Sequence, residues 1–115
     1  MSFRWPNKDP DEQLDYSMDW SRFLGAATIS TVVWSVETDD YSTRTVLASG
    51  QDLTTASGGA TTDSIQNVSQ TQTDTVATIN IGSGVNTRNY TFYCTMTDST
   101  GSTAIRSVNL KVRTR

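Results

Sequence analysis

The 115-residue chain contains no histidine, one cysteine and two prolines. Without histidine it lacks the commonest general base and the commonest side-chain ligand of transition metals. The single Cys94 excludes an internal disulfide and a cysteine-based zinc site. No stretch approaches the roughly 20 apolar residues of a membrane span, since polar residues interrupt the longest candidate, residues 29–36. These absences argue against an enzyme, a metalloprotein and a membrane-spanning protein.

Charged residues are few, and their balance is acidic. Nine Lys and Arg stand against twelve Asp and Glu, giving a formal net charge of −3 and a pI near 4.6. A nucleic-acid-binding protein needs a basic face that displaces counterions from phosphates, so we expect no nucleic-acid partner. Residues 1–63 hold ten acidic and four basic side chains, and residues 64–115 hold two and five. This asymmetry suggests a dipolar surface, with ordinary surface charge as the alternative.

Hydroxyl side chains supply most of the polarity, with 20 Thr and 14 Ser in the chain. Thr favours strands and Ser favours turns, so the composition predicts a soluble β-protein of a size that fits one domain. Residues 1–10 are polar and lack the apolar run of a signal peptide. We therefore expect synthesis in a cytosol, where the Cys94 thiol stays reduced.

Alternating apolar residues predict about seven strands. In residues 14–20, Leu14, Tyr16, Met18 and Trp20 alternate with polar side chains, which is the period of a strand with one buried face. Weaker patterns of the same kind predict strands over residues 29–36, 43–48, 64–70, 75–81, 89–97 and 103–113. Together with the turn residues between them, these strands predict an all-β, immunoglobulin-like antiparallel β-sandwich.

The predicted strand over residues 89–97 carries the immunoglobulin-like pattern. Tyr90, Phe92 and Cys94 face inward, as in the penultimate strand of such domains, where a cysteine lies beneath a core tryptophan. The partner cysteine is missing, so we expect Cys94 to be a small buried hydrophobe. Trp34 is the predicted aromatic centre of the core.

An extended N-terminal arm, residues 1–13, precedes the predicted sandwich of residues 14–115. Pro6 and Pro10 favour an extended backbone. Aromatic and arginine side chains are enriched at interface hot spots, and acidic residues suit docking on a basic partner. The alternative is an arm that folds back over the open end of the sandwich. The predicted partner-binding residues are Phe3, Arg4, Trp5, Lys8, Asp9, Asp11 and Glu12.

The acidic residues allow two further hypotheses. Carboxylates within residues 9–15 supply hard oxygen ligands for calcium, but no glycine follows to make the tight loop. Two carboxylates could also act as a glycosidase pair. The available pairs are Glu12 with Asp15, and Glu37 with Asp39 or Asp40. Neither pattern is specific, and we expect no catalytic residue, no metal and no cofactor.

The first 21 residues resemble a known family. The sequences FRWPNKDPDE (3–12), LDY (14–16) and DWS (19–21) are similar to those of small tailed-bacteriophage virion proteins of the fibre–tail adaptor or minor tail protein type. The strand with Trp34 and the C-terminal segments 89–97, 101–106 and 108–113 resemble the rest of that pattern. The resemblance implies a non-enzymatic structural protein, an adaptor that joins a fibre to the tail or neck.

The resemblance also implies partners and a location. The partners would be other phage structural proteins of the tail, neck or fibre, or of the capsid, with several copies in a symmetric assembly and no membrane partner. The location would be the virion, after synthesis in the host bacterial cytoplasm. Two alternatives stay open: a capsid decoration or cement protein, and a carbohydrate-binding module that stacks Trp5, Tyr41 and Tyr93 on sugars.

Overall fold

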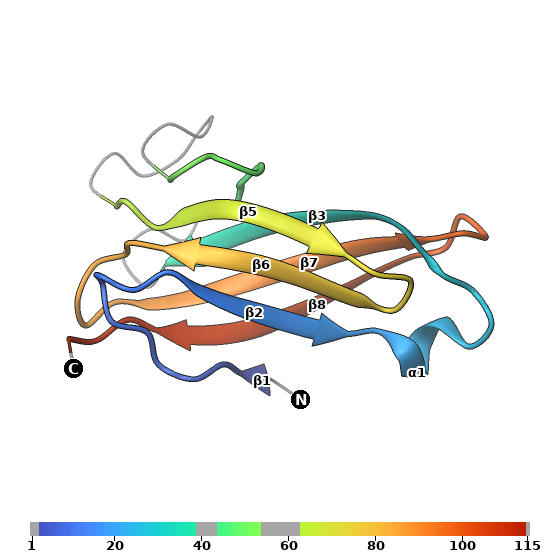
Figure 1. The fold of residues 1–115 in the computed structure, drawn as a ribbon, viewed down its shortest axis with the longest axis horizontal. Coiled ribbons are helices and arrows are strands. Elements are labelled where there is room, and N and C mark those ends of the chain that lie inside the picture. Colours follow the sequence, from blue (N-terminus) through green and yellow to red (C-terminus); the bar gives the residue numbers. More distant parts are fainter. Residues whose placement is uncertain (1–2, 39–43, 54–62, 115) are drawn as a thin grey trace.

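Two β-sheets packed face to face form the computed structural model of the chain, which describes residues 3–38, 44–53 and 63–114 (Figure 1). The larger sheet has the strand order β1-β8-β7-β3-β4, and the smaller has the order β2-β6-β5. Neighbouring strands are antiparallel except for the short β1, which runs parallel to β8. The predicted all-β sandwich is confirmed.

Each of the seven predicted strands has a counterpart, β2 to β8. The larger sheet contains β1 (Phe3–Arg4), β8 (Thr103–Lys111), β7 (Asn89–Asp98), β3 (Ile29–Thr38) and β4 (Thr45–Val46). The smaller sheet contains β2 (Leu14–Asp19), β6 (Val76–Gly82) and β5 (Gln66–Gln72). The sequence patterns did not predict β1, or the single helical turn α1 (Ser21–Leu24). Within the described residues no helix is long and apolar enough to cross a membrane.

The core lies between the sheets and has the predicted aromatic centre. Trp34 is 1% exposed, and its neighbour across the ladder, Cys94, is completely buried. Burial raises the pKa of the Cys94 thiol to about 11, so the thiol stays protonated at neutral pH. Other buried side chains alternate along β6 and β7, as the period of a strand requires: Ala77, Ile79, Ile81, Tyr90, Phe92 and Met96.

The strand order is consistent with the immunoglobulin-like prediction. In variable-type immunoglobulin domains one sheet contains neighbouring strands G, F, C and C′, and the other contains B, E and D. Here β8-β7-β3-β4 and β2-β6-β5 follow these two orders. The assignment to the immunoglobulin-like class itself stays a prediction.

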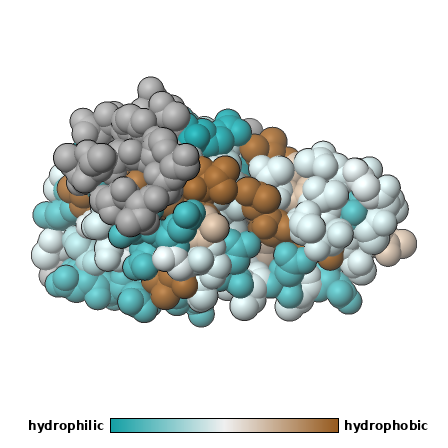
Figure 2. All heavy atoms as spheres, turned by 90° about the horizontal axis from the view of Figure 1, so that it is seen from above, coloured by the Kyte–Doolittle hydropathy of each residue, from teal (hydrophilic) through white to brown (hydrophobic). Residues whose placement is uncertain are grey.

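Side-chain amides close one long side of the sandwich, where β5 faces β3. Gln70 donates its Nε2–H to the carbonyl of Val32 at 3.2 Å, and Gln72 donates to Ser30 at 3.1 Å. These bonds occupy backbone acceptors of β3 in the part of that strand that β4 does not cover. Figure 2 looks down on this side and shows hydrophobic and hydrophilic residues intermixed. Polar cross-links therefore satisfy an edge that would otherwise be open to another strand.

Two contacts join the charge-asymmetric halves of the sequence. The guanidinium of Arg88, from the basic half, forms an ion pair of 3.0 Å with Asp63, from the acidic half. Lys111 lies beside Lys8, whose backbone N–H donates to the Lys111 carbonyl at 3.0 Å. The halves thus touch at these two points, and the dipolar surface stays a prediction.

Candidate interaction site

The N-terminal arm lies along β8 and continues the larger sheet. The Trp5 N–H donates to the carbonyl of Asn109 at 2.8 Å, and Arg113 donates to the carbonyl of Lys8 at 2.8 Å. Lys8 also forms an isolated parallel bridge with Val112. These contacts agree with the alternative considered from the sequence, an arm that folds back over the open end of the sandwich. The boundary between arm and sandwich at residue 13 stays a prediction, but the described part of the arm is packed on the sandwich.

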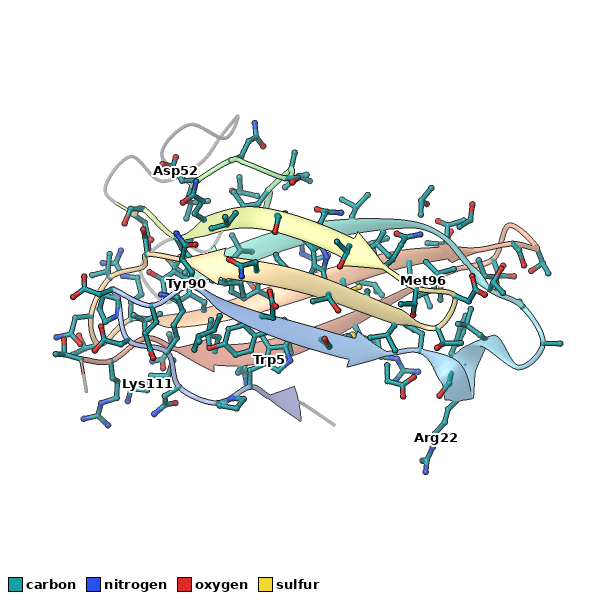
Figure 3. All side chains as sticks on the ribbon, viewed as in Figure 1. Trp5, Arg22, Asp52, Tyr90, Met96 and Lys111 are labelled. Atoms are coloured by element: carbon teal, nitrogen blue, oxygen red, sulfur yellow. The ribbon has the colours of Figure 1, made fainter. Side chains whose placement is uncertain are left out.

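Trp5 fills the open edge between the two sheets. Its ring stacks on Tyr16 with centroids 4.8 Å apart, and it lies 5.9 Å from Trp34 and 5.8 Å from Phe92. Its indole N–H donates to the carbonyl of Ser17 on β2 at 3.3 Å. Figure 3 shows Trp5 pointing from the arm into the sandwich. At 9% exposure this ring has little surface left for a partner or a sugar.

Lys8 is the second anchor of the arm, and it is completely buried. Its ammonium donates to the carbonyl of Asp9 at 2.8 Å and to the carbonyl of Ser83, in the loop after β6. Burial lowers the pKa of Lys8, while the nearby carboxylates of Glu12, Asp9 and Asp11 act in the opposite direction. The side chain therefore ties the arm to the neighbouring loop and is not presented to a partner.

The acidic turn, residues 9–12, follows Lys8 in the segment between β1 and β2. Glu12 accepts the Asp9 N–H at 2.9 Å through Oε1, and its own N–H donates to the Asp9 carbonyl at 3.0 Å. The Asp11 N–H donates to Asp9 Oδ1 at 2.9 Å, and the Asp11 side chain is exposed. The turn thus holds three carboxylates in a fixed backbone conformation.

The predicted partner-binding residues therefore fall into three groups. Trp5 and Lys8 are buried in the chain's own fold, whereas Asp9, Asp11 and Glu12 form the acidic turn. Phe3 and Arg4 form β1, and their side chains lie outside the described part of the structure. In the structure, Trp5 and Lys8 point from the arm into the sandwich, and the acidic turn lies at the surface. Their binding of a partner stays a prediction, and the acidic turn is the group best placed for it.

A groove of about 770 Å³ lies between β2 and β8, on the long side of the sandwich that Trp5 partly closes. Trp20 forms part of its lining and packs edge-on against Phe23, with ring centroids 5.9 Å apart. The guanidinium of Arg106 lies 5.3 Å from the centroid of the Trp20 ring. Phe23 is 41% exposed. The long side that the arm closes at Trp5 is thus open farther along, over an aromatic surface.

A buried polar cluster at the start of β7 was not foreseen from the sequence. The Tyr90 hydroxyl lies 2.9 Å from both carboxylate oxygens of Asp63 and accepts the Val85 N–H at 2.8 Å. Asp63 also accepts from Arg88 and from the Ile65 N–H, each at 3.0 Å. Burial raises the pKa of Tyr90 well above its ordinary value of 10.0. The sequence pattern predicted only that Tyr90 faces inward. It could not predict the cluster, because Asp63 and Arg88 are 25 residues apart in the sequence.

The carboxylates proposed for metal or glycoside chemistry have ordinary structural partners where they are described. Asp15 accepts the Asn80 amide N–H at 2.9 Å, and Glu37 accepts the Tyr93 hydroxyl. Asp39 and Asp40 lie outside the described residues, as does Tyr41. No group of three or more potential metal ligands occurs within the described ranges.

The Tyr93 ring, one of those considered for sugar stacking, has a cation over one face. The guanidinium carbon of Arg44 lies 3.7 Å from the ring centroid. This cation–π contact occupies the position that a sugar ring would take on that face. Since Trp5 is buried as well, the described residues give the carbohydrate hypothesis no exposed aromatic platform from these two rings.

Residues 8–63 match the model of a family described as podophage GP4 fiber-tail adaptor protein gp77. This segment runs from the buried Lys8 through the acidic turn, β2, α1, β3 and β4 to Asp63. The match confirms the resemblance to phage virion proteins of the fibre–tail adaptor type, and it covers just under half of the 115 residues. No curated protein matches the chain.

Proposed function

We propose that this protein is a non-enzymatic structural part of a tailed-phage virion, an adaptor that joins a fibre to the tail or neck. The observation that carries the proposal is the family match over residues 8–63. That segment contains the acidic turn together with Lys8 before it and β2 after it. The partners are other structural proteins of the particle, and the protein is made in the host cytoplasm before it is assembled into the virion.

The rigid mounting of the acidic turn supports a docking mechanism. Lys8 anchors one end of the turn in the fold, and β2 follows its other end. A pre-organised turn loses little conformational entropy on binding. Its carboxylates steer it towards a basic patch on a neighbouring protein and select against acidic surfaces. The chain then acts by position and charge rather than by turnover.

The buried titratable groups also favour a structural role. Lys8 links the arm to the loop after β6, and Asp63 links the start of β5 to Tyr90 on β7. Each of these groups is bonded to a different segment of the same chain, where it stabilises the fold. A catalytic acid or base needs reach to a substrate instead.

Charge reversal in the acidic turn tests the proposal. Particles lacking this protein are complemented with wild-type protein or with Asp11→Lys, and fibres on purified particles are counted by electron microscopy. Because like charges placed together across an interface cost several kcal/mol, we expect fibre-bearing particles to fall at least about tenfold with Asp11→Lys. The matched control is Asp74→Lys, an exposed acid in the turn between β5 and β6, outside the matched segment.

The outcomes separate the candidate functions. Loss of fibres with Asp11→Lys but not with Asp74→Lys supports docking through the acidic turn. Normal fibres with both variants would show that the turn does not carry the contact. Gold-labelled protein found over the capsid surface, with fibres unaffected by its absence, would overturn the adaptor proposal in favour of a decoration protein.

A further inference from the structure

The arm covers only part of the edge of β8. The carbonyls of Asn109 and Lys111 accept backbone N–H groups of the arm at 2.8 and 3.0 Å. Backbone groups alternate in direction along a strand, so the other odd-numbered residues of β8 direct their N–H and C=O groups to this same edge. The bridges of β1 begin at Val108, and within the described residues nothing pairs with the edge from Thr103 to Arg106. This part of β8 is free to pair with an added strand.

The groove between β2 and β8 continues the gap that Trp5 fills. Trp5 and Val108 line its closed end, and Trp20, Phe23 and Arg106 line the open part. The backbone of Trp5 pairs with β8, and its ring enters between the two sheets. The arm thus shows, in this molecule, how an extended segment fits the gap: its backbone pairs with β8, and a bulky side chain points inward.

The charges that line the groove are predominantly positive. Arg22 on α1 and Arg106 on β8 are exposed, and neither forms an ion pair within the described residues. Figure 3 shows Arg22 extending on the same long side as Trp5. Asp19 is the one carboxylate of the lining, and the Ser21 N–H that it accepts at 2.9 Å lowers its pKa. With two arginines against this one ionised acid, the groove favours an acidic ligand, although the whole chain has a net charge of −3.

Arg106 makes the groove selective. It lies directly opposite Cys94 on β7, so the two side chains share the core-facing side of the sheet. Its guanidinium lies 5.3 Å from the centroid of the Trp20 ring. An inward-pointing charge on an edge strand disfavours pairing with an apolar strand. A strand that brings a carboxylate to Arg106 compensates this charge, so the position selects its partner by charge.

We propose that the groove binds an extended acidic segment of another protein, which adds as a strand to residues 103–106 of β8. The segment pairs its backbone with the free edge, packs an apolar side chain on Trp20 and Phe23, and sets a carboxylate against Arg106. In strand addition the main-chain hydrogen bonds give affinity, and pockets for alternate side chains give specificity. The proposal does not depend on the acidic turn, whose residues do not line the groove.

Fluorescence anisotropy with the full chain tests the groove. The acidic probe is a fluorescein-labelled peptide of sequence TETFTET, and the basic probe is the matching peptide TKTFTKT. We expect a dissociation constant below about 1 mM for the acidic probe. The basic probe should bind at least about tenfold more weakly, because its lysines meet Arg22 and Arg106.

A charge reversal at Arg106 tests its role in selection. Arg106→Glu should weaken binding of the acidic probe at least about tenfold and should strengthen binding of the basic probe. The matched control is Arg113→Glu, the same charge change at an exposed position that does not line the groove, and it should leave both constants unchanged. Thermal melting verifies that both variants are folded.

Amide hydrogen exchange, followed by NMR, tests strand addition on the wild type and needs no variant. The N–H groups of Thr103 and Ile105 point to the free edge, so their exchange should slow at least about tenfold when the acidic probe is bound. Those of Ala104 and Arg106, which point towards β7, are the internal reference and should change far less.

The outcomes separate the possible occupants. A wild type that binds neither probe up to about 1 mM, or that binds both equally, would overturn the proposal. So would an Arg113→Glu variant as weakened as Arg106→Glu. Binding that leaves exchange at Thr103 and Ile105 unchanged would show that the probe is not an added strand. Dimerisation of the free chain that Arg106→Glu abolishes would assign the groove to a second copy instead.

Discussion

The two long sides of the sandwich are closed in different ways. Where β5 faces β3, the amides of Gln70 and Gln72 bond to backbone carbonyls across the gap. Where β2 faces β8, the arm inserts Trp5 as an apolar plug, and beyond that plug the side is open as a groove. One side is therefore held by polar cross-links at its surface, and the other by the N-terminal arm, whose strand β1 extends the larger sheet.

The comparison shows that the arm is a structural component of the fold. Burial of one indole removes far more apolar surface from water than two amide–carbonyl bonds do. The side closed by the arm should therefore contribute more to the free energy of unfolding than the side closed by glutamines. It also follows that the acidic turn is held rigidly, since Trp5 and Lys8 fix the backbone that leads into it.

The largest expected effect comes from Trp5→Ala. Truncating a buried tryptophan typically costs about 3–5 kcal/mol, a large part of the about 5–15 kcal/mol that stabilises a domain. We expect the free energy of unfolding in urea to fall by that amount, close to the loss for Trp34→Ala at the centre of the core. A Trp5→Ala variant that melts within a few degrees of the wild type would show that the arm only rests on the sandwich.

The Tyr90→Phe variant probes the buried cluster beside β5. It leaves the Asp63 carboxylate without the Tyr90 hydroxyl, so we expect a loss of about 1–3 kcal/mol at neutral pH. Because the pKa of Tyr90 is raised by folding, the wild type loses stability as the pH rises above the ordinary value of 10.0, and the variant lacks that loss. The difference in unfolding free energy should thus shrink above pH 10.0, and a constant difference would argue against a buried, protonated hydroxyl.

Smaller effects are expected on the glutamine side. Gln70→Ala and Gln72→Ala each remove one amide–carbonyl bond, and each should cost about 0.5–1.5 kcal/mol in urea unfolding. Ser69→Ala, at the exposed position just before Gln70 on the same strand, is the matched control. If either glutamine variant were as damaging as Trp5→Ala, the proposed contrast between the two sides would be wrong.

The strands were predictable because their burial is periodic. In β7 every second residue is buried, and this pattern identified Tyr90, Phe92 and Cys94 as core residues. The helical turn α1 was missed because a four-residue segment carries no periodicity, and its start is marked only by the Asp19 side chain accepting the Ser21 N–H at 2.9 Å. Local patterns of this kind are informative over long elements and weak over short ones.

The candidate site was only half predictable. The sequence marked residues 3–12 as unusual for their aromatic and acidic content, and the family match begins within this segment. It could not show that Trp5 and Lys8 point inward while Asp11 points outward. The two kinds of side chain alternate without a simple period, and their direction depends on how the arm pairs with β8.

The sequence by itself determined the strands, the core tryptophan and the absence of histidine, because each follows from residue identity or from a period of two along the chain. The tertiary structure alone decided which parts of the arm are inside and which are outside, and that Asp63 meets Tyr90 and Arg88. These contacts join residues distant in sequence, and only the packing of two sheets at a particular register sets the geometry that pairs them.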